Sequence, residues 1–159
     1  MNNIILCGYK SSGKTTLAKK IAEKTGLHCI DTDDLIAKNN RKFYLEVGPE
    51  VFREIEKEVI KALVGFENCV IATGGGVVLD PENIVLLKKL GKIFYLRVPK
   101  EELKRRLLLM ETLPGILDPL DPEGSFERMY ESRVDLYEKA ADYIIDSEEN
   151  IWGLIGYGK

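Results

Sequence analysis

An apolar segment at residues 4–7 runs directly into Gly8-Tyr-Lys-Ser-Ser-Gly13-Lys14-Thr15, and no other feature of the chain constrains the fold as strongly. The G-x-x-x-x-G-K-T pattern between a buried strand and a helix is typical of a phosphate-binding loop. Two glycines let the backbone fold tightly around an anion, and the N–H groups that follow point at it from the positive end of the helix. A glycine-rich turn that carries Lys-Thr by chance would not combine all of these features. The chain is therefore predicted to bind a nucleoside triphosphate.

The loop residues have separate expected roles. Backbone N–H groups of residues 11–15 would form the cradle, Lys14 would reach the β- and γ-phosphates, and the Thr15 hydroxyl would take one position on Mg²⁺. Lys14 is therefore both a nucleotide-binding and a candidate catalytic residue. The predicted nucleotide-binding residues of this loop are Ser11, Ser12, Gly13, Lys14, Thr15 and Thr16.

Length and charge narrow the class of protein. At 159 residues the chain can bury a proper core, and we expect a single domain over residues 1–159. A net charge of −3 implies no basic face, which argues against nucleic acid as a partner. No apolar run approaches the length of a membrane span, and the N-terminal residues read as a strand without a signal-peptide pattern. We therefore expect a cytoplasmic protein that acts on small molecules and has no membrane or nucleic acid as partner.

Cysteine and histidine usage supports the same expectation. The three cysteines, at positions 7, 29 and 69, lie in apolar stretches without C-x-x-C spacing. They are predicted to be buried thiols in a reducing compartment, because this pattern suits neither a disulfide framework nor a zinc site. His28 is expected to pack within a strand instead of binding a ligand.

Short apolar runs alternate with helical patterns along the chain. Nearly continuously apolar strands that are separated by helices predict a parallel sheet covered on both faces. The predicted strands are 4–7, 28–30, 69–72, 92–97 and 143–145, and the predicted helices are 14–25, 33–38, 48–63, 81–90, 100–110 and 126–139. The spacing within 48–63 predicts one buried side, formed by Val51, Phe52, Ile55, Val59 and Ala62.

The ends of the first three strands carry polar residues or glycine. Open α/β sheets bind ligands at the carboxyl ends of their strands. Here the first strand leads into the phosphate-binding loop, the second into Asp31-Thr32-Asp33-Asp34 and the third into Gly74-Gly75-Gly76. These three ends predict one functional site along a single edge of the sheet.

With these motifs in place, the chain resembles the shikimate kinase family over essentially its full length. The resemblance is carried by Gly8–Thr15, Asp31-Thr32-Asp33, Phe52-Arg53-x-x-Glu56, Gly74–Gly76 and Met129-x-x-x-Arg133-x-x-x-Tyr137. It implies an α/β, three-layer P-loop NTPase fold with a five-stranded parallel sheet flanked by helices and a lid segment. It also implies ATP- and Mg²⁺-dependent phosphorylation of the 3-hydroxyl of shikimate to shikimate 3-phosphate, a step of aromatic amino acid biosynthesis, and we expect a monomer.

The charged residues of these motifs suit a substrate that is both an acid and a polyol. Arg53 would hold the carboxylate with two parallel N–H bonds, and the resemblance assigns Arg133 as the second cation there. Asp33 would bind and orient the attacking hydroxyl and take its proton, which makes it a candidate catalytic residue. Asp31 would act on Mg²⁺ through water, and Glu56, at i+3, would pair with Arg53.

Other site residues depend more on the resemblance. The run Gly74–Gly76 is predicted to bind substrate, because glycine lets the main chain approach the substrate ring. By resemblance, Arg106 would pack against adenine. Asp34 is expected to serve a helix cap and first turn. Arg128 and Arg133 lie on a charged helix, where a solvated face is the ordinary expectation, and only the match to the family gives Arg133 a place in the site.

Residues 111–124 are predicted to form a lid. The part up to residue 122 contains three prolines and a glycine and is long enough to close over a site. In the family this segment usually carries an Arg-Pro pair whose arginine reaches the nucleotide phosphates, whereas here Leu113 precedes Pro114. Lys10, Arg106 and Arg128 are candidates for the missing cation, and we expect that a cation from elsewhere in the chain takes its role.

Two other functions fit part of the sequence. A gluconate-type or nucleoside-monophosphate kinase would share the fold and the loop, but D-T-D together with F-R-x-x-E and the triple glycine favours shikimate. A nucleotide-binding regulatory protein with weak activity would fit the missing lid arginine. The intact Lys14, Thr15 and Asp33 argue against it, because such a protein needs no complete metal and nucleophile site.

Overall fold

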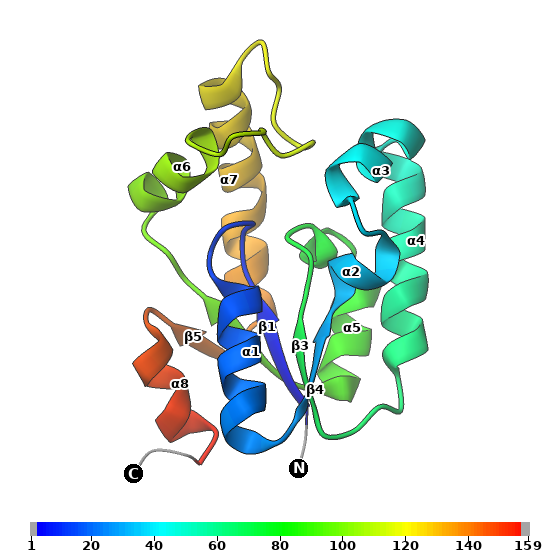
Figure 1. Cartoon of the computed structure of the whole chain (residues 1–159), viewed down its shortest axis with the longest axis vertical. Coiled ribbons are helices and arrows are strands. Elements are labelled where there is room, and N and C mark those ends of the chain that lie inside the picture. The colour runs from blue at the N-terminus through cyan, green and yellow to red at the C-terminus, as the bar shows by residue number, and fades with distance from the viewer. Residues whose placement is uncertain (1–2, 157–159) are drawn as a thin grey trace.

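The computed structural model describes residues 3–156, which form a five-stranded sheet between two layers of helices (Figure 1). All neighbouring strands are parallel, in the order β2-β3-β1-β4-β5. The strands are β1 (Asn3–Cys7), β2 (His28–Asp31), β3 (Cys69–Ala72), β4 (Gly91–Leu96) and β5 (Tyr143–Ile145). The helices are α1 (Lys14–Thr25), α2 (Thr32–Ile36), α3 (Asn40–Val47), α4 (Pro49–Leu63), the 3-10 turn η1 (Val77–Leu79), α5 (Pro81–Leu90), α6 (Lys100–Leu108), α7 (Pro122–Ala140) and α8 (Glu148–Leu154). The predicted three-layer α/β fold is confirmed.

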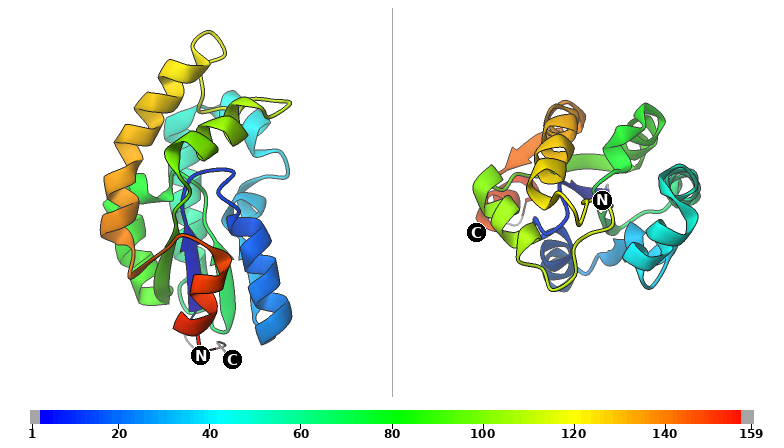
Figure 2. Two further views of the ribbon diagram at one scale, coloured as in Figure 1. Left: turned by 90° about the vertical axis from the view of Figure 1, so that its left-hand side faces the viewer. Right: turned by 90° about the horizontal axis from the view of Figure 1, so that it is seen from above.

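The central strand β1 separates two cores, because its side chains alternate between the faces of the sheet. Ile5 and Cys7 belong to the core under α4, α5, α6 and α7, whereas Ile4 and Leu6 belong to the core under α1 and α8. Figure 2 shows α1 and α7 on opposite sides of the sheet. All four side chains are buried, as expected for a parallel strand covered on both faces. This burial fixes the position of the loop that follows β1.

The edge strand β2 departs from that pattern. His28 and Cys29 are exposed, so the predictions that His28 packs inside and that Cys29 is buried are wrong. The reason is that β2 pairs with β3 alone and lies at the edge of the sheet, where a short apolar run does not reach the interior. Cys7 and Cys69 are buried as predicted, and burial raises the pKa of Cys7 to about 12, which keeps that thiol protonated.

Helix α4 buries a side that shares only Phe52 with the predicted one. Its buried residues are Phe52, Glu56, Ile60 and Leu63, whereas Val51 is 49% exposed. The buried stripe contains a glutamate, and apolar spacing alone therefore selects the wrong side. A buried carboxylate needs a partner, and its partner belongs to the site described below.

Two features near the cavity, the whole of helix α3 and the start of α7, were not apparent from apolar spacing. Helix α3 is absent from the prediction because it buries no residue; its N-cap Asn39 accepts a hydrogen bond from the N–H of Lys42 at 3.0 Å. Helix α7 begins at Pro122 instead of residue 126, because the Asp121 side chain caps it by accepting from the N–H of Gly124 at 3.1 Å. Residues 122–124 of the predicted lid therefore belong to α7, and the segment between α6 and α7 is 109–121.

Helix α8, also absent from the prediction, lies beside α1. Lys24 Nζ is 4.2 Å from the centre of the Trp152 ring, and Lys20 pairs with Glu148 at 2.7 Å. These contacts place α8 along the middle and end of α1, whereas the phosphate-binding loop lies at its start. None of the helices within residues 3–156 is long and apolar enough to cross a membrane.

Candidate active site

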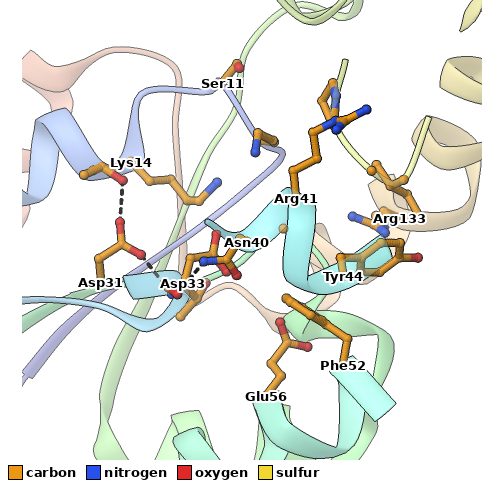
Figure 3. Close-up of a pocket in the computed structure, with 18 of the residues that line it drawn as sticks. Ser11, Lys14, Asp31, Asp33, Asn40, Arg41, Tyr44, Phe52, Glu56 and Arg133 are labelled. Carbon is orange, nitrogen blue, oxygen red and sulfur yellow. Dashed lines mark hydrogen bonds between the residues drawn. The ribbon is translucent and has the colours of Figure 1, made fainter. Parts of the chain in front are cut away.

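The carboxyl ends of β1, β2 and β3 open on a cavity of about 370 Å³ (Figure 3). The loop after β1 and the start of α2 line one side, and α4 and α7 line the other. The loop after β3 lies between them, because a Cβ on Gly75 would lie 3.4 Å from both the backbone nitrogen of Lys10 and Nη1 of Arg133. Residues 114–116 of the segment between α6 and α7 also line it. A concave site of this volume suits a small molecule, and its place at the strand ends is the one that the sequence predicts.

The phosphate-binding loop requires glycine at both ends. Gly8 has φ 146° and Gly13 has φ 97°, values that L side chains rarely adopt. A Cβ on Gly8 would also lie 2.9 Å from the backbone oxygen of Leu96. Gly13 is the N-cap of α1, and no side chain caps that helix. Its first N–H groups are therefore available to an anion in the loop.

Lys14 is buried beneath this loop. Its Nζ donates to the carbonyl oxygens of Gly8 at 2.7 Å and Tyr9 at 2.6 Å, and to Ser12 Oγ at 3.4 Å. Burial lowers the pKa of Lys14 to about 8, although the nearby Asp33 carboxylate acts in the opposite direction. A bound phosphate would favour the charged ammonium, so we expect nucleotide binding to raise this pKa.

Asp31 links the loop to the start of α2. Its Oδ2 accepts from the Thr15 hydroxyl at 2.7 Å, and its Oδ1 accepts from the N–H of Asp33 at 2.9 Å. Asp31 is thus the N-cap of α2. Asp34, which the sequence placed at the cap or in the first turn of a helix, lies exposed in the first turn of α2. Within residues 3–156 no three His, Cys, Asp or Glu side chains gather as a metal site. The oxygens of Thr15 and Asp31 nevertheless fit Mg²⁺, which takes few protein ligands and completes its shell with phosphate and water.

The run Gly74–Gly76 lies against three polar side chains of the site. A Cβ on its first residue would lie 2.7 Å from Oδ1 of Asp33, and one on its second residue 3.4 Å from Nη1 of Arg133. A Cβ on its third residue would overlap with the guanidinium of Arg53. None of the three glycines has a positive φ. Close approach of these side chains, not backbone conformation, therefore favours glycine at the first and third positions, whereas 3.4 Å at the second is an ordinary van der Waals contact.

The charged side chains of the site lie close enough to pair and to shift one another's pKa values. Arg53 Nη1 pairs with Glu56 Oε1 at 2.9 Å, so the predicted pair is present and its glutamate is the one in the buried stripe of α4. Burial raises the pKa of Glu56, and the charge of Arg53 opposes that shift. Burial raises the pKa of Asp33 as well; Asp31 adds to the shift and Lys14 opposes it. A raised pKa suits a carboxylate that accepts a proton from a substrate.

Arg133 reaches the cavity from α7, although the charged helix pattern alone favoured solvent exposure. Only 5% of the residue is exposed, and in the described part of the chain its Nε has no hydrogen-bond partner. Tyr137, one turn further along α7, donates its hydroxyl to the carbonyl of Gly75. A buried guanidinium of this kind is suited to a carboxylate or phosphate ligand.

Most of the predicted site residues line the cavity, and three do not. The Ser12 side chain is buried and accepts from Lys14, the first glycine of the run Gly74–Gly76 does not reach the cavity surface, and Arg106 donates to the carbonyl of Ser11 at 3.1 Å from outside the cavity. The predicted residues that line the cavity are Ser11, Gly13, Lys14, Thr15, Thr16, Asp31, Asp33, Arg53, Gly75, Gly76 and Arg133.

Comparison with known proteins agrees with this arrangement. A family model described as shikimate kinase matches residues 10–152. This chain belongs to the shikimate kinase family. The shikimate kinases of Caldicellulosiruptor bescii and Thermodesulfovibrio yellowstonii are each 40% identical to it over 152 residues, 93% of this chain and 87% of theirs. The structure of shikimate kinase from Acinetobacter baumannii in complex with shikimate matches with a TM-score of 0.87 and 30% identity, over 100% of this chain and 95% of that one.

This member of the family has one cavity wall that sequence reasoning missed. Asn40, Arg41 and Tyr44 line the cavity from α3. Asn40 Nδ2 donates to the carbonyl of Asp33 at 2.6 Å, and Arg41 Nε donates to the carbonyl of Leu113 at 2.7 Å. The available signal was an asparagine before this segment and a glycine after it, which are typical of helix ends. Without buried residues the segment lacks the apolar period that predicts a helix.

Proposed function

We propose that this chain transfers the γ-phosphoryl group of ATP to the 3-hydroxyl of shikimate, releasing ADP and shikimate 3-phosphate. One observation carries the proposal. Arg53, Arg133 and Asp33 converge on the run Gly74–Gly76, and the same cavity extends to the phosphate-binding loop. The cavity therefore provides cations for a carboxylate at one end and an anion site for the nucleotide at the other.

The two arginines would recognise the carboxylate of shikimate. Both guanidinium groups present planar pairs of N–H donors that match a carboxylate. Glu56 holds Arg53 by its Nη1, at 2.9 Å, so the orientation of that guanidinium is set before the substrate arrives. The main chain at Gly75 would approach the substrate ring, and its neighbours Gly74 and Gly76 leave room for the polar side chains that surround it.

Asp33 would orient the hydroxyl that attacks. In the proposed reaction the hydroxyl oxygen bonds to the γ-phosphorus, the bond from that phosphorus to the bridging oxygen of ADP breaks, and the hydroxyl proton passes to Asp33. Lys14 and the N–H groups of the loop would stabilise the charge on the phosphoryl oxygens. Mg²⁺ held by Thr15, and by Asp31 through water, would neutralise phosphate charge. Arg106, beside the loop, would pack against adenine.

A coupled assay of ADP release tests the proposal. The purified chain, with ATP and Mg²⁺, is given shikimate, gluconate and the nucleoside monophosphates in separate reactions. We expect turnover with shikimate and phosphate on its 3-hydroxyl, identified by NMR of the product. Faster turnover with gluconate or a nucleoside monophosphate would overturn the substrate assignment, and ATP binding without turnover of any acceptor would favour the regulatory alternative.

The proposal also includes a monomer that acts in the cytoplasm. Light scattering at assay concentrations tests the monomer, for which we expect a mass near 18 kDa. Fractionation of cells that express a tagged chain tests the location.

A further inference from the structure

Five cationic side chains line the cavity: Lys10, Lys14, Arg41, Arg53 and Arg133. Three of them already have roles, since Lys14 lies in the phosphate-binding loop and two arginines flank the proposed carboxylate site. Arg41 is different, because no motif includes it and no role follows from the predicted site. Its side chain reaches over the cavity in the space between Lys14 and Arg133 (Figure 3).

The guanidinium of Arg41 is oriented but not neutralised. Its Nε donates to the carbonyl of Leu113 at 2.7 Å, which fixes the plane of the group. Among residues 3–156 no carboxylate pairs with it, and its two terminal nitrogens form no hydrogen bond. A planar pair of free N–H donors at the wall of a cavity is the arrangement that binds phosphate or carboxylate oxygens.

The position of Arg41 in α3 has no structural advantage. It lies in the first turn of the helix, next to the N-cap Asn39, where the helix dipole disfavours a cation. The first turn of α3 contains no acidic residue that would offset this effect. Among the described residues, the hydrogen bond to the carbonyl of Leu113 orients Arg41 without pairing its charge. A residue that opposes a local rule in this way is expected at functional sites.

We propose that Arg41 is a catalytic residue that binds the oxygens of the transferring phosphoryl group, held in place by the carbonyl of Leu113. This inference rests on the proposed kinase function. The substrate carboxylate is the other possible anion, but Arg53 and Arg133 already supply four or more N–H donors to its two oxygens. The phosphoryl group gains negative charge on three oxygens during transfer and has only lysine side chains near it in the loop. The contact with Leu113 also joins Arg41 to the segment 109–121, which carries the predicted lid.

Two of the cations suggested by the sequence are placed elsewhere. Arg106 pairs with Glu102 at 3.0 Å and contacts the outer side of the loop. Arg128 pairs with Asp121 at 3.3 Å, and neither residue lines this cavity. Lys10 does line the cavity and remains the competitor that an experiment must separate from Arg41.

The first experiment compares Arg41→Gln with Lys42→Gln. Lys42 is the next residue of the same helix, but its side chain is exposed and lies 3.8 Å from Glu46, so its substitution removes the same charge outside the cavity. We expect Arg41→Gln to lower kcat by about 10²-fold, the usual cost of one donor to developing charge, with the KM for shikimate within a few-fold of the parent. Lys42→Gln should keep the kcat of the parent. Thermal unfolding of both variants verifies the fold.

Two results would overturn the proposal. A raised KM for shikimate with unchanged kcat would place Arg41 on the carboxylate. A near-normal kcat for Arg41→Gln, with a large loss in Lys10→Gln, would assign the role to Lys10.

A binding measurement tests the role of Arg41 without depending on which substrate accepts the phosphoryl group. Calorimetry without any acceptor compares ADP with an ATP analogue that has a non-hydrolysable γ-phosphate. Arg41→Gln should weaken the analogue at least several-fold more than it weakens ADP, because the contact is with the γ-phosphate. Equal effects on both nucleotides would overturn the proposal. If the coupled assay instead finds another acceptor, shikimate is wrong as the substrate while this difference still stands.

Introducing an arginine into the lid segment, at position 113, supplies a rescue test. The backbone at Leu113 contacts Arg41 through its carbonyl, while the Leu113 side chain packs against the core. An arginine at 113 therefore starts beside Arg41 in the backbone and must turn its side chain toward the cavity. We expect Leu113→Arg alone to give no gain in kcat, because Arg41 already fills the role. In the Arg41→Gln background the same substitution should restore at least part of the lost kcat. A several-fold gain from Leu113→Arg alone would contradict the recruitment of Arg41.

Discussion

The two sides of the cavity are built in different ways. The glycine wall consists of Gly74–Gly76 and the side chains that contact them, chiefly Asp33, Arg53 and Arg133. Its groups are largely buried and held by defined partners, such as the Arg53–Glu56 pair at 2.9 Å. Each position there is determined by a neighbour that leaves little space, so we infer that this wall recognises substrate in a fixed geometry.

The lid wall consists of α3 and residues 109–121, and it has few such constraints. Helix α3 buries no residue, and in residues 109–121 only Pro114 and Leu117 are buried, whereas Leu109 and Leu120 are 71% and 95% exposed. Segments with few buried apolar contacts change position at a small cost in free energy, which suits closure over a nucleotide. The glycine wall is thus suited to recognition of substrate and the lid wall to closure. Similar small substitutions in the two walls are therefore expected to change shikimate affinity unequally.

The largest effect is expected at Asp33. Asp33→Asn keeps the size of the side chain but removes its charge and its basic oxygens, so kcat should fall by about 10²-fold or more. Asp34→Asn is the matched control, because Asp34 is exposed in the first turn of α2 and should change kcat little. A kcat for Asp33→Asn within a few-fold of the parent would reduce Asp33 to a structural role and remove the chemistry from the glycine wall.

The same residue makes a prediction for pH. Because burial raises the pKa of Asp33 in the free chain, the acid side of the kcat/KM profile should fall at a pH above the ordinary range of an aspartate. The raised pKa also means that the native state binds this proton more tightly than the unfolded state does. The ionised carboxylate therefore lowers the free energy of unfolding at neutral pH, and this cost disappears as the pH falls through the raised pKa. Asp33→Asn should accordingly raise the unfolding temperature at neutral pH while it lowers activity.

A pair of glycine substitutions compares the walls directly. In Gly76→Ala the new Cβ would overlap with the guanidinium of Arg53, a group at the end of a flexible side chain. The fold should survive, but Arg53 must move, and we expect shikimate affinity to fall by about 10²-fold, as when one partner of a charge pair is lost. In Gly115→Ala the Cβ would lie 3.0 Å from the Tyr44 ring, on the lid wall. There a small shift suffices, and calorimetry should find shikimate affinity within a few-fold; equal losses in both variants would refute the comparison.

A smaller effect is expected for Arg53→Lys. Lysine keeps the charge but cannot offer the paired donors of a guanidinium, so shikimate affinity should fall roughly tenfold or more, equivalent to one charge-assisted hydrogen bond. Nucleotide affinity without shikimate should not change, since Arg53 lies at the other end of the cavity from the loop. Unchanged shikimate affinity in a folded Arg53→Lys chain would exclude the bidentate contact.

The two walls also differ in how far the sequence could predict them. The strands, the loop and the glycine run have strong local signals, because buried parallel strands are continuously apolar and tight backbone contacts require glycine. These local signals are sufficient to locate most of the glycine wall. The prediction for the buried side of α4 failed because Glu56 lies inside as the partner of Arg53. A pairing between two side chains leaves no apolar period in the sequence.

The lid wall could not be predicted in the same way. Helix α3 has no buried residue to create a period, and the start of α7 depends on a single cap, Asp121, before a proline. The contact between Arg41 and the carbonyl of Leu113 joins residues 72 positions apart and involves a backbone atom, so neither side-chain type records it. The sequence revealed that a lid cation was missing, and only the tertiary arrangement indicates which residue could replace it.

The smallest effect concerns the loop between the two walls. Ser11 has φ 64°, a left-handed conformation that costs an L residue roughly 1 kcal/mol relative to glycine. Ser11→Gly should therefore stabilise the fold by up to about 1 kcal/mol, which corresponds to a rise of about 2–4 °C in Tm, less the entropy that glycine adds to the unfolded chain. Asn68→Gly is the control, because Asn68 has φ 59° in the turn before β3, far along the sheet from the loop, and asparagine tolerates this conformation better than serine. We expect Asn68→Gly to gain less stability and to leave nucleotide affinity unchanged.

If Ser11→Gly gains stability but weakens nucleotide binding, the strained serine is part of the preformed anion site, and the loop behaves like the glycine wall. If its nucleotide affinity is unchanged, only the backbone shape at position 11 matters, and the serine side chain contributes nothing to the anion site.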